Sequence, residues 1–226
     1  MDPGTLAIGT SLGLLGIALA YVAVRAFVKF AEARSMPQLM WGTGLAFGAA
    51  AMAVETVVYF GYVSEGLLQA YVFFSAAIVG VLSLGATRVL RSARFEAVYL
   101  WYTIAGCVAV GVASFLTPLS PSMVSQGVIA QDPPLLLLVL STLVTGPATV
   151  VLVGSAVQGL RRSRRWQTML MVAGALVLGA GGTLYIASFP VALYYAEFIG
   201  IGLLFLGLVS LPTTTQAASG HPAPSS

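Results

Sequence analysis

Hydrophobic runs of membrane-spanning length alternate with short polar segments along the whole chain. They cover residues 5–24, 39–62, 67–90, 97–119, 135–160, 169–188 and 191–211. A tilted helix needs about 20 residues to cross a hydrocarbon core ~30 Å thick, and each run supplies them. The runs are continuous rather than alternating in polarity, which favours helices over a β-barrel. The pattern predicts an all-α integral membrane protein with a seven-helix transmembrane domain.

Positive charge is confined to alternate connections between these spans. All ten Lys and Arg residues fall within three clusters, at 25–34, 88–94 and 161–165. Cytoplasmic loops of membrane proteins retain Lys and Arg, so the three clusters should share one side of the membrane. This predicts an N-terminus outside and a C-terminus inside, and we expect a multi-pass protein of the plasma membrane.

Composition supports lipid as the main solvent of the chain. Hydrophobic residues make up 58% of it and charged residues only 8%, whereas a soluble domain carries about 25% charged residues. The net charge of +3 comes from the cytoplasmic clusters. It indicates an affinity for anionic lipid headgroups, or for a partner protein at the arginine-rich inner face, rather than for nucleic acid.

The connections suggest a symmetric plan. The longest one, from Ser120 to Pro134, is expected to cap the outer face, whereas the connections between spans two and three and between spans six and seven are tight. Spans one to three and five to seven repeat the same order of elements around a single fourth span, so they could be parallel repeats in a 3+1+3 plan. The polar, proline-rich tail at 212–226 is predicted to be disordered.

Two resemblances to known families bear on this plan. Seven spans with this orientation resemble a microbial rhodopsin, but the last span has no lysine for a retinal Schiff base, so that family is not assigned. The Pro37-Gln38 dipeptide resembles that of PQ-loop and SWEET-type carriers, which share the 3+1+3 plan, although here it precedes a span. The second resemblance implies transport.

Two carboxylates lie inside predicted spans, Glu55 in span two and Glu197 in span seven. An ionised residue near the bilayer centre costs about 2.5–3.5 kcal/mol on insertion scales, so such residues face the bundle interior and mark functional sites by default. No Lys or Arg is expected at their depth. Each carboxyl is therefore predicted to be protonated, hydrogen-bonded to tyrosines or bound to a cation, unless it only joins two helices as a neutral donor.

The residues that share a helix face with Glu55 indicate that this face points inward. The same face carries Met52, Gly48 and Gly44 before it and Tyr59 after it, and Gly44-x-x-x-Gly48 would allow close helix approach. Several tyrosines lie toward the outer ends of the spans, as either an interfacial belt or an outward-facing pocket would require. The predicted ligand or proton site contains Glu55, Glu197, Tyr59, Tyr71, Tyr185 and Tyr194.

Gly146 and Pro147 interrupt span five near its middle. Proline removes one backbone hydrogen bond and kinks a helix. We expect the hydroxyls of Ser141, Thr142 and Thr145 to satisfy the freed carbonyls, and the kink to serve either as a hinge or in helix packing.

Other residue types exclude several kinds of site. The only histidine, His221, is in the tail, the only lysine, Lys29, is in the first basic cluster, and Cys107 is the only cysteine. No cofactor or metal site is predicted, and we expect no enzyme, although the glutamate pair leaves an intramembrane hydrolase as a remote alternative. Three functions stay open. They are a small carrier or channel for protons, cations or a solute, a sensing bundle that binds a small ligand and signals through a partner, and an accessory subunit of a membrane complex.

Overall fold

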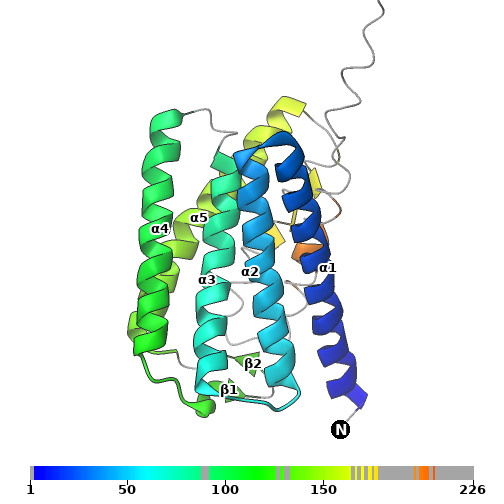
Figure 1. The fold of residues 1–226 in the computed structure, drawn as a ribbon, viewed down its shortest axis with the longest axis vertical. Coiled ribbons are helices and arrows are strands. Elements are labelled where there is room, and N and C mark those ends of the chain that lie inside the picture. The colour runs from blue at the N-terminus through cyan, green and yellow to red at the C-terminus, as the bar shows by residue number, and fades with distance from the viewer. Residues whose placement is uncertain are drawn as a thin grey trace, which may run out of the picture.

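The protein folds into a bundle of long antiparallel helices (Figure 1). The computed structural model describes residues 3–87, 92–125, 128–129 and 133–163, with shorter pieces at 166, 169–170, 173–174, 176–177, 196, 199–203 and 206. Its helices are α1 (Pro3–Ala33), α2 (Met36–Tyr59), α3 (Glu65–Ala86), α4 (Ala93–Leu116) and α5 (Leu135–Ser163). A 3₁₀ turn (Pro121–Met123) and a hairpin of two short strands, β1 (Val124–Ser125) and β2 (Val128–Ile129), connect α4 to α5.

All five helices are long and apolar enough to cross a membrane. Large apolar side chains lie on the outside of the bundle, such as Val98 and Trp101, each 70% exposed, and Leu116, 78% exposed. Hydrocarbon rather than water suits such a surface, so the chain is a membrane-embedded helical bundle.

Five of the seven predicted spans therefore appear as helices. Most of predicted spans six and seven lies outside the described residues, although the described pieces at 169–170, 173–174, 176–177, 199–203 and 206 are helical. The seven-helix count, the orientation and the 3+1+3 repeat stay predictions. The tail at 212–226 lies outside the described residues.

Several helix ends differ from the hydrophobic runs, because hydropathy marks the hydrocarbon crossing while helices continue beyond it. α1 extends to Ala33 rather than to residue 24, so Arg25 and Lys29 lie on a helix and not in a loop. α2 begins at Met36, which places Pro37-Gln38 in its first turn, where proline is favoured, rather than in a loop before the span. It ends at Tyr59 rather than at residue 62, and Gly61 follows with a φ of +93°.

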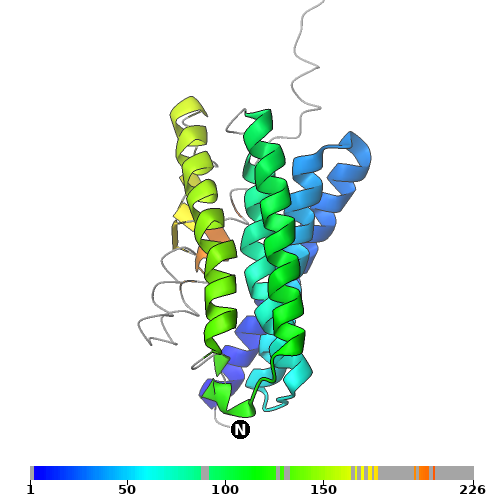
Figure 2. The ribbon, with the colours of Figure 1, turned by 90° about the vertical axis from the view of Figure 1, so that its left-hand side faces the viewer.

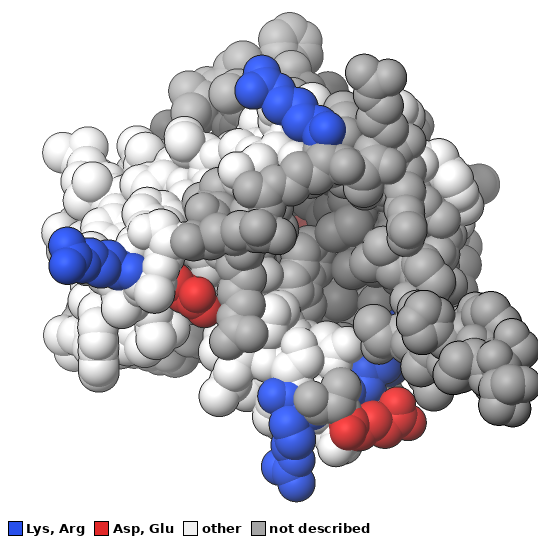
Figure 3. Space-filling view, turned by 90° about the horizontal axis from the view of Figure 1, so that it is seen from above, with Lys and Arg blue, Asp and Glu red and all other residues white. Residues whose placement is uncertain are grey.

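The two ends of the bundle differ in chemistry. Figure 3 looks down on one end, where basic side chains lie at several places along the rim and acidic side chains lie beside some of them. The last part of α1, with Arg25 and Lys29, and the residue after it, Arg34, lie at this end. Arg94 at the start of α4 and Arg161 near the end of α5 lie here as well. We call this the basic end. The hairpin and the N-terminus lie at the opposite, capped end (Figure 2).

The connection between α4 and α5 closes the capped end. Leu119, Met123 and Ile129 are all at most 6% exposed. The carboxylate of Glu65, the first residue of α3, accepts a hydrogen bond from the Leu119 backbone N–H at 3.3 Å and so ties the connection to α3. The described part of residues 120–134 covers this end of the bundle, as predicted, whereas its location on the outer side of the membrane stays a prediction.

Two apolar clusters fill most of the described interior. The cap-side cluster lies between the cap and the adjoining parts of α2 to α5, and its buried members are Ala51, Val58, Leu68, Tyr71, Val72, Ala113, Leu119, Met123, Ile129 and Leu137. The α1-side cluster is centred on α1 and α2, and its buried members are Leu12, Leu15, Leu19, Val22, Ala23, Leu45, Met52, Leu82 and Ile201.

Glycines on α2 bring it close to α3, as their spacing predicted. A Cβ atom on Gly44 would lie 2.7 Å from Leu82 Cγ and 3.1 Å from the Leu82 backbone nitrogen. A Cβ on Gly48 would lie 2.5 Å from Ile78 Cδ1. The predicted close approach along Gly44-x-x-x-Gly48 is confirmed.

Candidate functional site

Glu55 is a carboxyl-bearing side chain in the interior of the bundle. It is 1% exposed and belongs to the buried face of α2, together with Gly44, Gly48 and Met52. Four residues separate it from the end of α2, a distance of about 6 Å along the helix axis. Glu55 therefore faces inward as predicted and lies closer to the capped end than to the basic end.

The neighbours of Glu55 on α2 belong to two different apolar clusters. Ala51, one turn before it, and Val58, one turn after it, are members of the cap-side cluster. Met52 belongs to the α1-side cluster, and Tyr59 packs against that cluster. The carboxyl thus lies on the part of α2 where the two clusters meet, and we call this place the seam.

Two of the four tyrosines predicted to join the site lie on opposite sides of the seam. Tyr59 is half-buried beside the α1-side cluster, whereas Tyr71 of α3 is buried in the cap-side cluster. Tyr185, Tyr194 and Glu197 lie outside the described residues. Of the predicted site residues, the structure thus brings Glu55 and Tyr59 onto one stretch of α2 and places Tyr71 in the cluster on the other side of the seam.

A helical piece from the C-terminal part of the chain reaches the bundle interior. Ala196, Gly200 and Ile201 are buried, and Ile201 is a member of the α1-side cluster, to which Met52 also belongs. A segment distant in sequence therefore packs into the α1-side cluster, to which α2 also contributes.

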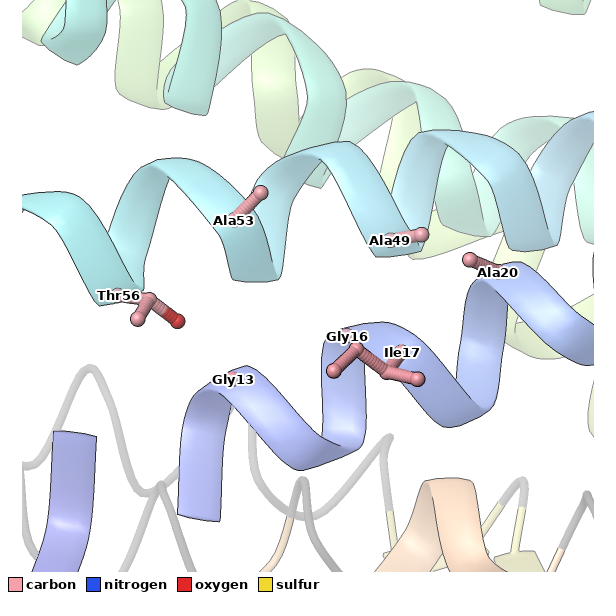
Figure 4. Close-up of a pocket in the computed structure, with 7 residues that line it drawn as sticks. All are labelled: Gly13, Gly16, Ile17, Ala20, Ala49, Ala53 and Thr56. Carbon is pink, nitrogen blue, oxygen red and sulfur yellow. The ribbon is translucent and has the colours of Figure 1, made fainter. Parts of the chain in front are cut away.

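A groove of about 390 Å³ separates parts of α1 and α2 on another side of the bundle (Figure 4). Small or apolar residues line it, with Thr56 as the only hydroxyl among Gly13, Gly16, Ile17, Ala20, Ala49, Ala53 and Thr56. The Thr56 hydroxyl donates to the Met52 carbonyl at 2.6 Å, within its own helix. The groove therefore presents an apolar surface without a free hydroxyl.

The predicted hinge residues lie within α5, and their environment differs from the expectation. Proline has no N–H, so Pro147 cannot donate to the carbonyl of Leu143, four residues earlier. Thr142 and Thr145 do not reach this carbonyl. They donate to Leu138 O at 2.7 Å and to Ser141 O at 2.9 Å. The expectation that hydroxyls of α5 repair the break is wrong, because Tyr102 of α4 donates its hydroxyl to Leu143 O instead.

Sequence reasoning missed this tyrosine and the polar contacts behind it. The hydroxyls of Ser83 in α3 and Tyr99 in α4 are 2.7 Å apart, and Ser83 also donates to Gly80 O at 2.6 Å. The Tyr99 ring stacks on the Tyr102 ring, with centroids 6.2 Å apart. The spacing of Tyr99 and Tyr102, three residues apart in one helix, is the only sequence signal for this network.

Within the described part of the chain, no group of three or more His, Cys, Asp and Glu residues could hold a metal ion. Cys107 is a half-buried free thiol in α4. The comparisons with known proteins add no family to this picture. No protein-family model, curated protein or solved structure matches the chain.

Proposed function

We propose that this protein is a small multi-pass membrane carrier or channel for protons, small cations or a small solute, with Glu55 as its proton- or cation-binding group. The observation that carries the proposal is the burial of the Glu55 carboxyl at the seam between two apolar clusters. An ionised carboxylate in such surroundings loses several kcal/mol of solvation. A carboxyl at this position is therefore suited to take up a proton or a cation.

The position at the seam supports movement as well as binding. Carriers alternate access to a fixed site by moving one group of helices against another. The apolar clusters on either side of Glu55 are the units that would move in this way, and the carboxyl lies on α2, one of the helices that contribute to both. A change in its proton or cation load would then act where the two units meet.

We propose Glu197 as the second carboxyl of the site. In a continuous helix, position 197 shares a face with positions 200 and 201, which are three and four residues later. Gly200 and Ile201 are both buried, and Ile201 belongs to the α1-side cluster. On the helix predicted for span seven, Glu197 would therefore share the face that meets the α1-side cluster.

The tyrosines would serve as hydrogen-bond donors to the carboxyls. Tyr59 and Tyr71 flank the seam from opposite clusters, and we propose Tyr185 and Tyr194 as further members of the site. The burial of Tyr71 beneath the cap favours an enclosed ion or proton site over an open ligand pocket for sensing. Gly146 and Pro147 would form a hinge in α5, and the capped end would face outside.

The proposal is tested in proteoliposomes that contain a pH-sensitive dye and carry an imposed pH or cation gradient. Glu55→Gln keeps the size of the side chain but cannot ionise, and the matched control is Glu32→Gln, on an exposed residue of α1. We expect flux in the wild type and in Glu32→Gln, and loss of flux in Glu55→Gln. Size-exclusion profiles of all variants check that they fold.

Two results would contradict the proposal. Wild-type flux that persists unchanged in the Glu55→Gln/Glu197→Gln double variant would exclude the carboxyls as the transport site. Absence of wild-type flux for protons and for a panel of monovalent cations and small solutes would exclude transport and leave sensing or an accessory role.

A further inference from the structure

The carbonyl of Leu143 lies at the break that Pro147 makes in α5. In an α-helix this carbonyl would accept from the N–H of residue 147, which proline lacks. The Leu143 side chain is 54% exposed on the lipid-facing surface of the bundle. In hydrocarbon, an unsatisfied backbone carbonyl costs several kcal/mol, because no water replaces the missing donor. The hydroxyl of Tyr102 supplies that donor from the neighbouring helix α4.

Helix packing does not account for the Gly146-Pro147 pair. Both residues are exposed, and a Cβ atom on Gly146 would meet nothing within 4 Å. By contrast, a Cβ on Gly106 of α4 would lie 2.7 Å from Val144 Cγ2, so close contact between α4 and α5 occurs there. The proline therefore interrupts α5 at a point that contributes nothing to the helix interface through its side chain.

The Tyr102 side chain is held in place by contacts that extend to a third helix. Its ring stacks on Tyr99 at an interplanar angle of 24°, and Tyr99 stacks on Phe95 with centroids 5.5 Å apart. The Tyr99 hydroxyl lies 2.7 Å from the hydroxyl of Ser83 in α3. The donor to α5 is thus fixed to α4 and, through Tyr99, to α3.

We propose that Tyr102 is a positioning residue that clasps α5 at its proline break. The interhelical hydrogen bond satisfies the carbonyl that proline leaves free and attaches α5 to α4 at the break. Loss of the hydroxyl would remove this donor from Leu143 O and would let α5 move relative to α4 at the break. The hydrogen bond and ring contacts of Tyr102 support the clasp whatever the protein does, and only its link to transport rests on the proposed function.

A double-mutant cycle between Tyr102→Phe and Pro147→Ala tests the clasp. Alanine at 147 restores the backbone N–H, so Leu143 O regains its ordinary partner and no longer depends on Tyr102. In the wild-type background, we expect Tyr102→Phe to lower the folded-to-unfolded ratio about threefold, the size typical of an interhelical hydrogen bond in a membrane protein. In the Pro147→Ala background the effect should disappear.

The cycle separates the hydrogen bond from the packing of the ring. Phenylalanine keeps the stacking on Tyr99. If Tyr102 contributed only through the packing of its ring, Tyr102→Phe would leave the folded-to-unfolded ratio unchanged in both backgrounds, and the clasp would be overturned. An equal effect in both backgrounds would likewise overturn the clasp. Tyr21→Phe, on an exposed tyrosine of α1, is the matched control and should leave the ratio unchanged.

A distance measurement reports the movement directly. Two spin labels would be attached, one on α4 at Arg94→Cys and one on α5 beyond Pro147 at Arg161→Cys. Cys107→Ala removes the native thiol, so that only these two positions are labelled. Tyr102→Phe should broaden the distance distribution, and adding Pro147→Ala should narrow it again. An unchanged distribution in Tyr102→Phe would refute the clasp whether or not the protein transports anything, whereas failure of transport alone would leave it intact.

Discussion

The close approach of α2 to α3 at Gly44 gives the sharpest prediction for the stability of the bundle. In Gly44→Ala, the new Cβ would lie 2.7 Å from Leu82 Cγ and 3.1 Å from the Leu82 backbone nitrogen. Optimal contacts between non-bonded carbon atoms are about 3.5–4.0 Å apart. The Leu82 side chain could rotate away, but its backbone could not, so α2 and α3 must separate by a few tenths of an ångström. Overpacking of this kind costs about 1–3 kcal/mol.

Helix propensity opposes this loss, so the assay needs a glycine control. Alanine is better than glycine in a helix interior by about 0.5–1 kcal/mol. Gly154 lies in α5, and a Cβ there would meet nothing within 4 Å, so Gly154→Ala reports the gain in propensity alone. The two variants should differ by about 1–3 kcal/mol in the free energy of unfolding, measured by denaturing-detergent titration with far-ultraviolet circular dichroism. Equal stability of the two variants would refute the close approach.

Two further substitutions test local features of the described helices. Arg34 has a φ of +50° and donates its N–H to Phe30 O at 2.7 Å, in the left-handed conformation that commonly ends a helix. Arg34→Gly should therefore stabilise the protein by up to about 1 kcal/mol, whereas the control Arg25→Gly, on an exposed residue in the interior of α1, should destabilise it. Ile129 is 1% exposed beneath the cap. Ile129→Ala should therefore lower the free energy of unfolding by about 2–5 kcal/mol. The control Leu116→Ala, on the lipid-facing surface, should lower it much less. A smaller loss at residue 129 than at residue 116 would contradict the buried cap.

The pattern of apolar runs was sufficient to predict the helices, because in lipid the backbone must satisfy its own hydrogen bonds and helices do so within one segment. The ends were less accurate, since the headgroup region allows helices to continue past the apolar stretch, as α1 does around Arg25 and Lys29. Capping by the connection after α4 was also foreseen. Its attachment through Glu65 was not, because that contact joins residues 54 positions apart.

The inward position of Glu55 was predictable from chemistry alone, since a carboxyl is costly in hydrocarbon and α2 has one face of small residues. The seam could not be predicted from the sequence, because which residues of α2 join which apolar cluster depends on how the helices are arranged in space. The predicted hydrogen-bond donor to the carbonyl at the proline break was wrong for a similar reason. Sequence reasoning considered hydroxyls within α5, whereas Tyr102 reaches Leu143 O from position 102, 41 residues earlier.

Glu55 and the proline break both lie where apolar clusters of the bundle meet. On α5, Leu137 is a member of the cap-side cluster and Leu140 packs against it, while Leu152, beyond Pro147, packs against the α1-side cluster. α5 therefore passes from the cap-side cluster toward the α1-side cluster across the residue that lacks a backbone N–H, with Val144 and Val151 in two smaller clusters on either side of it. On α2, by contrast, the two clusters contact different faces of the helix around Glu55. A helix that joins two packed units must bend where they move apart, and a missing backbone hydrogen bond is the place where bending costs least. Relative motion of the clusters, as proposed for transport, would combine a charge change at the seam on α2 with bending of α5 at the clasped proline break.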